Sequence, residues 1–213
     1  MRKVPFVESE YYHVYNRGVD KRNIFEDRKD LDRFFQSIKE FNSIEPIGSI
    51  FENSFNDKKD IEKLVEIVCY CINPNHFHFV LRQLVKNGIT EFMRRLGGYT
   101  WYFNNRHKRN GALFQGRFKS SHISTNEYLL HVSAYVNLNN RFDGKPYSLS
   151  KSSWEEYIGT ENECICSPGT ILEQFNNSKE YQKFALSSLK DILRRKGLAK
   201  ELESLPLGGS TAK

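Results

Sequence analysis

Two histidines, His76 and His78, are the residues whose types and spacing point most directly to chemistry. Phe77 separates them within a run of strand-forming residues, so we expect them at alternate positions of one β-strand. Alternate strand residues face the same side of a sheet, roughly 7 Å apart at their Cα atoms, while Phe77 and Phe79 turn toward a core. Imidazoles at this spacing can converge on one metal ion. The alternative is a histidine pair that is only solvated or hydrogen-bonded.

A predicted helix over residues 127–138 offers a nucleophile and an oxygen ligand. Tyr135 and Asn139 are spaced i, i+4, so we expect them to stack on one face of this helix. A tyrosine hydroxyl is a competent nucleophile toward a phosphate that a metal ion polarises. The amide oxygen of Asn139 would complete a mixed nitrogen and oxygen ligand set that suits Mg²⁺ or Mn²⁺. Tyr128, seven residues earlier, is a rival nucleophile, and His131 could transfer protons, pack or contact DNA.

The surrounding pattern predicts the elements that must position these groups. Strand signals cover residues 11–15, 64–71, 76–83 and 111–124, with a turn at 73–75 and a polar loop at 42–59. Helical periodicity covers residues 30–41, 90–106 apart from Gly97 and Gly98, and 127–138. We expect Thr90 to cap the second helix and Thr125 or Asn126 the third, and the two glycines to allow a close approach to the sheet or a ligand.

This order of elements predicts an α+β fold. The succession β-α-β-β-α-β is typical of a ferredoxin-like or RRM-like antiparallel sheet with helices on one face. We assign residues 1–146 to this domain and residues 147–213 to a mostly helical C-terminal extension, with a helix over about 179–195. That helix could contact DNA or a second subunit, or it could cover the sheet.

Length and composition limit the class of protein. A chain of 213 residues with 38% hydrophobic residues suits one domain, or one domain with an appendage. No apolar run approaches ~18 residues and no secretory signal is evident, so we expect no membrane association and a cytoplasmic, nucleoid-associated protein. Cys69 and Cys71 suit a reducing core, and Cys164 and Cys166 lack the spacing of a zinc site.

Positive charge is concentrated in one segment. The net charge is +6, yet residues 86–119 contain eight basic residues against a single acid, Glu91, with aromatic residues interleaved. Such a segment is typical of a nucleic-acid surface, although a solvated helix with a buried aromatic stripe would look similar. We assign DNA binding to the basic residues Arg94, Arg95, Arg106, Lys108, Arg109, Arg117 and Lys119.

Four segments together carry a family resemblance. Residues 11–18, 73–78, 111–120 and 128–139 read Tyr-Tyr-His-Val-Tyr-Asn-Arg-Gly, Asn-Pro-Asn-His-Phe-His, Gly-Ala-Leu-Phe-Gln-Gly-Arg-Phe-Lys-Ser and Tyr-Leu-Leu…Tyr-Val-Asn-Leu-Asn. In this order the chain resembles the single-tyrosine HUH transposases, particularly the branch associated with repetitive extragenic palindromes. The resemblance covers roughly residues 8 to 145.

The resemblance implies an activity and residue roles. His76 and His78 match the metal-binding pair, Tyr135 the catalytic tyrosine and Asn139 the metal ligand four residues later. The implied enzyme cleaves single-stranded DNA beside a hairpin through a 5′-phosphotyrosine intermediate, with Mg²⁺ or Mn²⁺, as a monomer or homodimer.

Other interpretations stay open at this point. Asn16 and Arg17 could hold the DNA backbone or only build a turn, and Gln115 and Arg117 could contact the hairpin or only form a strand edge. The whole chain could instead be a non-catalytic, domesticated hairpin-binding protein or repressor, whose binding needs neither Tyr135 nor a metal. It could also be an RNA-binding ferredoxin-like domain that uses sheet aromatics.

Overall fold

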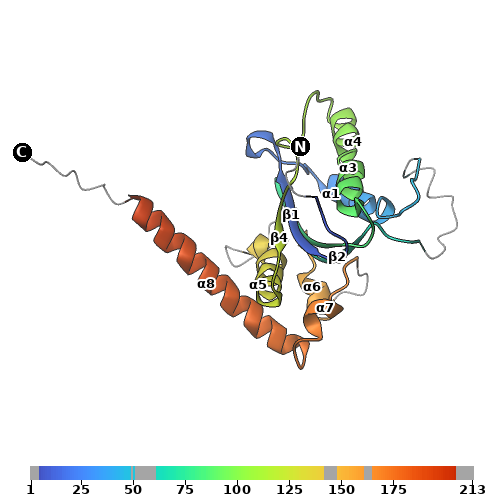
Figure 1. Ribbon diagram of the computed structural model, residues 1–213. Coiled ribbons are helices and arrows are strands. Elements are labelled where there is room, and N and C mark those ends of the chain that lie inside the picture. The colour runs from blue at the N-terminus through green and yellow to red at the C-terminus, as the bar shows by residue number, and fades with distance from the viewer. Residues whose placement is uncertain (1–4, 49, 51–60, 142–147, 161–164, 205–213) are drawn as a thin grey trace, which may run out of the picture.

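The computed structural model describes residues 5–48, 50, 61–141, 148–160 and 165–204, with side chains as far as residue 194. Its centre is a five-stranded sheet (Figure 1) with the strand order β4-β1-β3-β2-β5. The strands are β1 (Tyr11–Arg17), β2 (Val65–Asn73), β3 (His76–Gln83), β4 (Lys119–Ile123) and β5 (Lys151–Ser152). Each neighbouring pair is antiparallel. The predicted α+β class and antiparallel sheet are confirmed.

The register of the sheet gives its two faces different chemistry. His78 of β3 is the register partner of Tyr15 in β1 and of Cys71 in β2, the two strands that flank β3. Paired residues on neighbouring strands point to the same face, so these three side chains share one face of the sheet. His76 and His13 lie on this face as well, because they are two residues from His78 and Tyr15 along their strands. We call it the histidine face. The opposite face carries Phe77, Phe79 and Val14, which are all buried.

A layer of helices covers the apolar face. It consists of α1 (Arg28–Glu40), α3 (Gly88–Leu96) and α4 (Tyr99–Arg106). Phe34 of α1 packs on Phe77, and Phe92 of α3 packs on Phe79. The core therefore lies between this layer and the sheet, as the alternation around the histidine pair predicts.

The histidine face is also covered, which corrects the expectation of helices on one face. Helix α5 (Asn126–Asn137) brings Tyr135 against His13 and His78 with the rings edge to face. Thr125 caps α5 by accepting a hydrogen bond from the Tyr128 amide, as predicted. The prediction of a one-sided fold was wrong because α5 was treated as part of the helical layer, whereas β4 returns the chain to the other face.

The C-terminal part extends the sheet and then packs on α5. Beyond β5 the chain forms the short helices α6 (Trp154–Tyr157) and α7 (Gly169–Leu172) and the long helix α8 (Ser178–Ser204), which runs along α5 and past it in Figure 1. Tyr181 of α8 is buried and accepts a hydrogen bond from Asn137 of α5. The domain boundary at residues 146 and 147 stays a prediction, although β5 pairs with β2.

Several local expectations need correction. The predicted strand over 111–124 is shorter, because only Lys119–Ile123 is a strand and an isolated bridge joins Phe114 to Gly18. Helix α3 begins at Gly88 after Asn87, not at a Thr90 cap. The helix does break at Gly97 and Gly98, but no sheet atom lies within 4 Å of a Cβ built on either glycine. Most of the predicted loop at 42–59, and Cys164, lie outside the described residues.

Other sequence features agree with the structure. Cys69, Cys71 and Cys166 are buried free thiols. Gly18, within one of the family-like segments, occupies a position where a Cβ would lie 2.1 Å from the carbonyl oxygen of Arg22, so only glycine fits. Among the described residues, no helix has the length and apolar character needed to cross a membrane.

Candidate active site

His76 and His78 lie together at the start of β3, on the face that α5 covers. Their ring centroids are 5.2 Å apart and the rings are nearly perpendicular. His78 is buried, with 8% of its surface exposed, and His76 is half-buried. Arg17, the strand partner of His76, is exposed at the end of β1. Burial lowers the pKa of His76, and the nearby charge of Arg17 lowers it further, while Asn139 acts in the opposite direction. These effects favour a neutral imidazole.

Neighbouring amides determine which nitrogen of His76 carries its proton. Nδ1 lies 2.6 Å from Oδ1 of Asn75, an oxygen that can only accept, so Nδ1 is the donor. In the neutral ring Nε2 then has a lone pair. The side-chain nitrogen of Asn73 donates to this Nε2 at 3.1 Å and to Oδ1 of Asn139 at 2.8 Å. His76 therefore presents Nε2 as a base or a ligand.

Asn139 completes this group, although it is not part of α5. The helix ends at Asn137, and Asn139 begins a short 3-10 turn, η2 (Asn139–Arg141). The helical i, i+4 spacing expected between Tyr135 and Asn139 is therefore wrong in detail. The turn still directs the buried Asn139 side chain to the histidines, with Oδ1 3.0 Å from Nε2 of His76.

Tyr135 lies beside the same groups. Its ring contacts those of His13 and His78 at centroid distances of 6.0 and 5.6 Å. Burial raises the pKa of Tyr135, and a hydrogen bond with Asn139 offsets part of that effect. The phenol is thus protonated at neutral pH in the free protein.

The two other candidates on α5 lie elsewhere. Tyr128 is 44% exposed, near the N-terminal end of the helix. His131 faces α8, where its Nδ1 is 2.8 Å from the Ser188 hydroxyl and its ring packs on Phe184. Of the three roles open to His131, which are proton transfer, packing and contact with DNA, these contacts favour packing.

Sequence reasoning missed the contribution of β1. Nε2 of His13 is 2.9 Å from Nδ1 of His78, and Tyr15 packs against both rings. Burial lowers the pKa of His13 to about 4, so this ring is neutral near pH 7. The signal was present, because His13 and Tyr15 alternate along a strand as His76 and His78 do.

The donor set fits a divalent cation. Nε2 of His76 and Oδ1 of Asn139 are both acceptors, yet they lie 3.0 Å apart, an arrangement that a shared cation would stabilise. Neighbouring oxygen or nitrogen ligands around an octahedral ion at ~2.1 Å lie about 3.0 Å from each other. Among the described residues, no three His, Cys, Asp or Glu side chains form a metal-binding group, and the oxygen atom beside the histidine pair is that of Asn139.

Three of the arginines assigned to DNA are engaged in ion pairs. Arg94 and Arg95 both bond to Glu91, at 2.6 and 2.7 Å, and hold the pKa of that carboxyl below its usual range. Arg95 also donates to the Ser43 carbonyl and has only 10% of its side chain exposed. Arg94 remains exposed, so it is still available to a phosphate.

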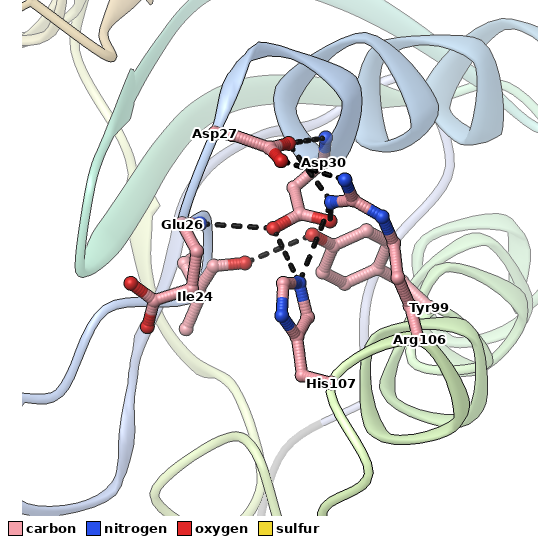
Figure 2. Close-up of polar contacts among 7 residues, drawn as sticks. All are labelled: Ile24, Glu26, Asp27, Asp30, Tyr99, Arg106 and His107. Carbon is pink, nitrogen blue, oxygen red and sulfur yellow. Dashed lines mark hydrogen bonds and ion pairs between the residues drawn. The ribbon is translucent and has the colours of Figure 1, made fainter.

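Arg106 belongs to an ion-pair cluster that surrounds the buried Asp30 between α1 and α4 (Figure 2). Its guanidinium lies 2.6 Å from Asp27 and 2.5 Å from Asp30, and His107 lies 2.8 Å from the other oxygen of Asp30. Asp30 is fully buried. Arg106 holds the pKa of Asp27 well below its usual range. A structural role therefore accounts for Arg106, because the burial of Asp30 requires a paired cation.

The remaining predicted DNA contacts lie in loops and at the sheet edge. Lys108, Gln115, Arg117 and Lys119 are exposed, and Arg109 packs over the ring of Phe103. Asn16 donates to the Gly116 carbonyl and accepts from the Arg17 amide. The turn predicted at Asn16 and Arg17 is wrong, because both residues belong to β1.

A cavity of about 740 Å³ connects some of these residues. Asn16, Arg94 and Arg117 line it together with Phe77 and Phe114. Phe77 belongs to the apolar face, so this cavity lies across the sheet from Tyr135.

Comparisons with known proteins show to which family the chain is similar. The family model described as "Transposase IS200 like" matches residues 6–139, a range that contains both histidines, Tyr135 and Asn139. No protein with a curated description matches the chain. A solved structure described as a REP-associated tyrosine transposase bound to a REP hairpin is similar, with 12% identity and a TM-score of 0.47. The similarity covers 78% of this chain and 93% of that one.

Proposed function

The chain belongs to the IS200-like transposase family, and from this membership we propose that it cleaves and rejoins single-stranded DNA with Tyr135 as the nucleophile. The observation that carries the proposal is the meeting of Tyr135, Asn139, His76 and His78 on one face of the sheet within a single chain. His76 and His78 come from β3, whereas Tyr135 of α5 and Asn139 of η2 lie about 60 positions later in the sequence. A DNA-binding protein without catalysis would have no need for this arrangement.

Tyr135 attacks the scissile phosphorus in the proposed reaction. A bond forms between its hydroxyl oxygen and phosphorus, the bond from phosphorus to the 3′ oxygen breaks, and the phenol loses its proton to solvent. The 3′ oxygen leaves as a hydroxyl, and the 5′ phosphate stays on the tyrosine. The number of phosphate ester bonds is unchanged, so the 3′ hydroxyl of another strand can reverse the step without ATP.

Three side chains would hold the metal ion, Mg²⁺ or Mn²⁺. Nε2 of His76 has its lone pair fixed by Asn75, Oδ1 of Asn139 lies beside it, and His78 is the neighbouring imidazole. The ion would supply Lewis acidity at the phosphate and so favour attack and departure. Arg17, beside His76 and exposed, supplies a positive charge for the same DNA strand.

We propose a DNA hairpin next to the cleaved strand as the bound substrate. Two segments, residues 11–18 and 111–120, support this choice, because both belong to the pattern that resembles the family. They lie side by side in the structure, where the backbone amide of Gln115 donates a hydrogen bond to the carbonyl oxygen of Arg17. The exposed basic residues Lys108, Arg117 and Lys119 would hold its backbone. We also propose that the protein is associated with the nucleoid, because its substrate is DNA. One chain contains the complete set, so a monomer could act alone, and a homodimer is not required by the geometry.

The test uses labelled single-stranded oligonucleotides with the hairpins that flank the gene. Protein, DNA and Mn²⁺ are incubated and separated on a denaturing gel, and we expect a band of protein joined to the 5′ phosphate. Tyr135→Phe and EDTA should each remove this band. Tyr128→Phe is the matched control, since it removes an exposed hydroxyl from the same helix and should leave the band unchanged.

A different result would change the assignment. Tight hairpin binding without any covalent product, on authentic flanking DNA, would indicate the non-catalytic hairpin-binding protein instead. Binding that prefers RNA would indicate the RNA-binding domain.

A further inference from the structure

The hydrogen bond between His13 and His78 is the feature of the histidine face that the proposed chemistry does not yet use. Nε2 of His13 and Nδ1 of His78 are 2.9 Å apart. The ring centroids are 5.1 Å apart and the ring planes differ by only 16°, so the rings meet edge to edge through these nitrogens. This is the geometry of an in-plane hydrogen bond between imidazoles.

Only one proton can lie between these two nitrogens, and its position decides what His78 can do. If His13 donates, Nδ1 of neutral His78 is the acceptor and the single ring proton of His78 is on Nε2, so that nitrogen cannot bind a metal. If His78 donates from Nδ1, its Nε2 has a free lone pair. The direction of a single hydrogen bond therefore determines whether His78 is a ligand.

The comparison with His76 shows why a partner is needed. Nδ1 of His76 faces the amide oxygen of Asn75, which accepts only, so its tautomer is fixed. His78 faces another imidazole, which can accept or donate. His13 can accept this proton through Nε2 when its own ring proton is on Nδ1.

We propose that His13 is a positioning residue of the metal site, which accepts the Nδ1 proton of His78 and thereby makes Nε2 of His78 the coordinating atom. This inference rests on the proposed function, because it assumes that His78 binds the ion. It adds β1 to the elements that build the site. His13 lies diagonally across the pair β1 and β3, since its direct strand partner is Val80.

Two substitutions at position 13 separate this role from simple packing. His13→Gln places an amide oxygen near the position of Nε2 and keeps an acceptor. His13→Phe keeps a ring of similar size without any acceptor. His122→Phe is the matched control, because His122 is an exposed histidine of the same sheet that pairs with Glu10.

The first measurement is the dissociation constant of the full chain for Mn²⁺, from the electron paramagnetic resonance signal of the free ion. We expect about 10–100-fold weaker binding in His13→Phe, as for other losses of a ligand's hydrogen-bond partner. His13→Gln should stay within about threefold of the unchanged protein, and His122→Phe should have no effect. Circular dichroism melting verifies that each variant is folded.

The second measurement reads the tautomer of His78 directly. Long-range ¹H–¹⁵N spectra of the metal-free protein should show the proton of His78 on Nδ1, and His13→Phe should lose this preference. A proton on Nε2 of His78 in the unchanged protein would overturn the inference. So would equal Mn²⁺ affinity in His13→Phe, a His13→Gln variant as weak as His13→Phe, or no Mn²⁺ binding by the unchanged protein.

The failure of this inference can be told apart from the failure of the proposed function. If the Tyr135-dependent covalent band forms with Mn²⁺ and the His13 variants bind the ion normally, only the role of His13 is wrong. If the band never forms, the transesterase is wrong, while the tautomer spectrum still reports whether His13 accepts from His78.

Discussion

Two polar clusters lie on opposite sides of the same sheet and are built in opposite ways. The ion-pair cluster of Asp27, Asp30, Arg106 and His107 contains formal charges, and each acid has a cation within hydrogen-bond distance. The histidine face carries no acidic side chain in its central set, and two of its acceptors, Nε2 of His76 and Oδ1 of Asn139, lie next to each other.

The difference separates stability from function. Paired charges satisfy one another, so the ion-pair cluster needs no partner from outside the protein and holds α1 against α4. Adjacent acceptors repel each other slightly, so the histidine face is improved by a bound cation. We therefore expect substitutions in the first cluster to change folding, and substitutions in the second to change catalysis.

The largest expected effect is that of His76→Ala on catalysis. Loss of a metal ligand should lower the rate of single-turnover DNA cleavage by about 10³-fold or more. The free energy of unfolding, measured in urea, should change by less than about 1 kcal/mol, because His76 is only half-buried, at the first position of β3. If His76→Ala instead loses much of its stability and keeps its cleavage rate, the histidine face has a structural role and not a catalytic one.

Asp30→Asn should have the largest effect on stability. Arg106 and His107 would lose a buried anion, so we expect the free energy of unfolding to fall by about 3 kcal/mol. Asp32→Asn is the control on the same helix, since Asp32 forms an exposed pair with Arg28 and should cost less than about 0.5 kcal/mol. If both variants unfold at the same urea concentration, the ion-pair cluster is not structural.

A smaller effect distinguishes structural arginines from those that bind DNA. Arg117→Gln should weaken hairpin binding and reduce the slope of log affinity against log salt by about one counterion. Arg106→Gln should leave that slope unchanged while lowering the melting temperature, because its guanidinium is held by Asp27 and Asp30. If both variants change the salt dependence of hairpin binding equally, Arg106 does contact the DNA.

Protonation of His13 and His76 makes the stability of the protein depend on pH. The pKa of His13 falls from an ordinary 6.5 to about 4 in the folded protein, and that of His76 is lowered as well. The unfolded chain thus binds more protons between these values, so the free energy of unfolding should fall as pH decreases from 6.5 to 4. Urea titrations at several pH values should show a shallower fall in His13→Gln. A slope that His13→Gln leaves unchanged would argue against a buried, neutral His13.

The sequence predicted the parts of the site that follow from local periodicity. His76 and His78 share a face because strand residues alternate, and the register of β1, β2 and β3 agrees with that expectation. Tyr135 packs against His78 from α5, the element in which the helical periodicity of residues 127–138 places it. Asn139 lies near Tyr135 and His76, as predicted, but the reason differs. The prediction assumed that a continuous helix carries Asn139, whereas the 3-10 turn η2 after α5 directs it to the site.

The missed features depend on contacts between distant segments. Arg106 meets Asp27 and Asp30 across more than 70 residues, and no local pattern predicts such pairing. His13 meets His78 only because of the register between β1 and β3. The placement of α5 opposite the other helices likewise depends on how the chain crosses the sheet edge after β4.

The most direct test of the account is to identify the residue that becomes joined to DNA. Trypsin releases residues 120–141 as one peptide, which contains both Tyr128 and Tyr135. After cleavage of a hairpin oligonucleotide and nuclease digestion, fragmentation in a mass spectrometer should place the remaining nucleotide on Tyr135. A nucleotide on Tyr128, or on a residue outside this peptide, would contradict the assignment of the active site.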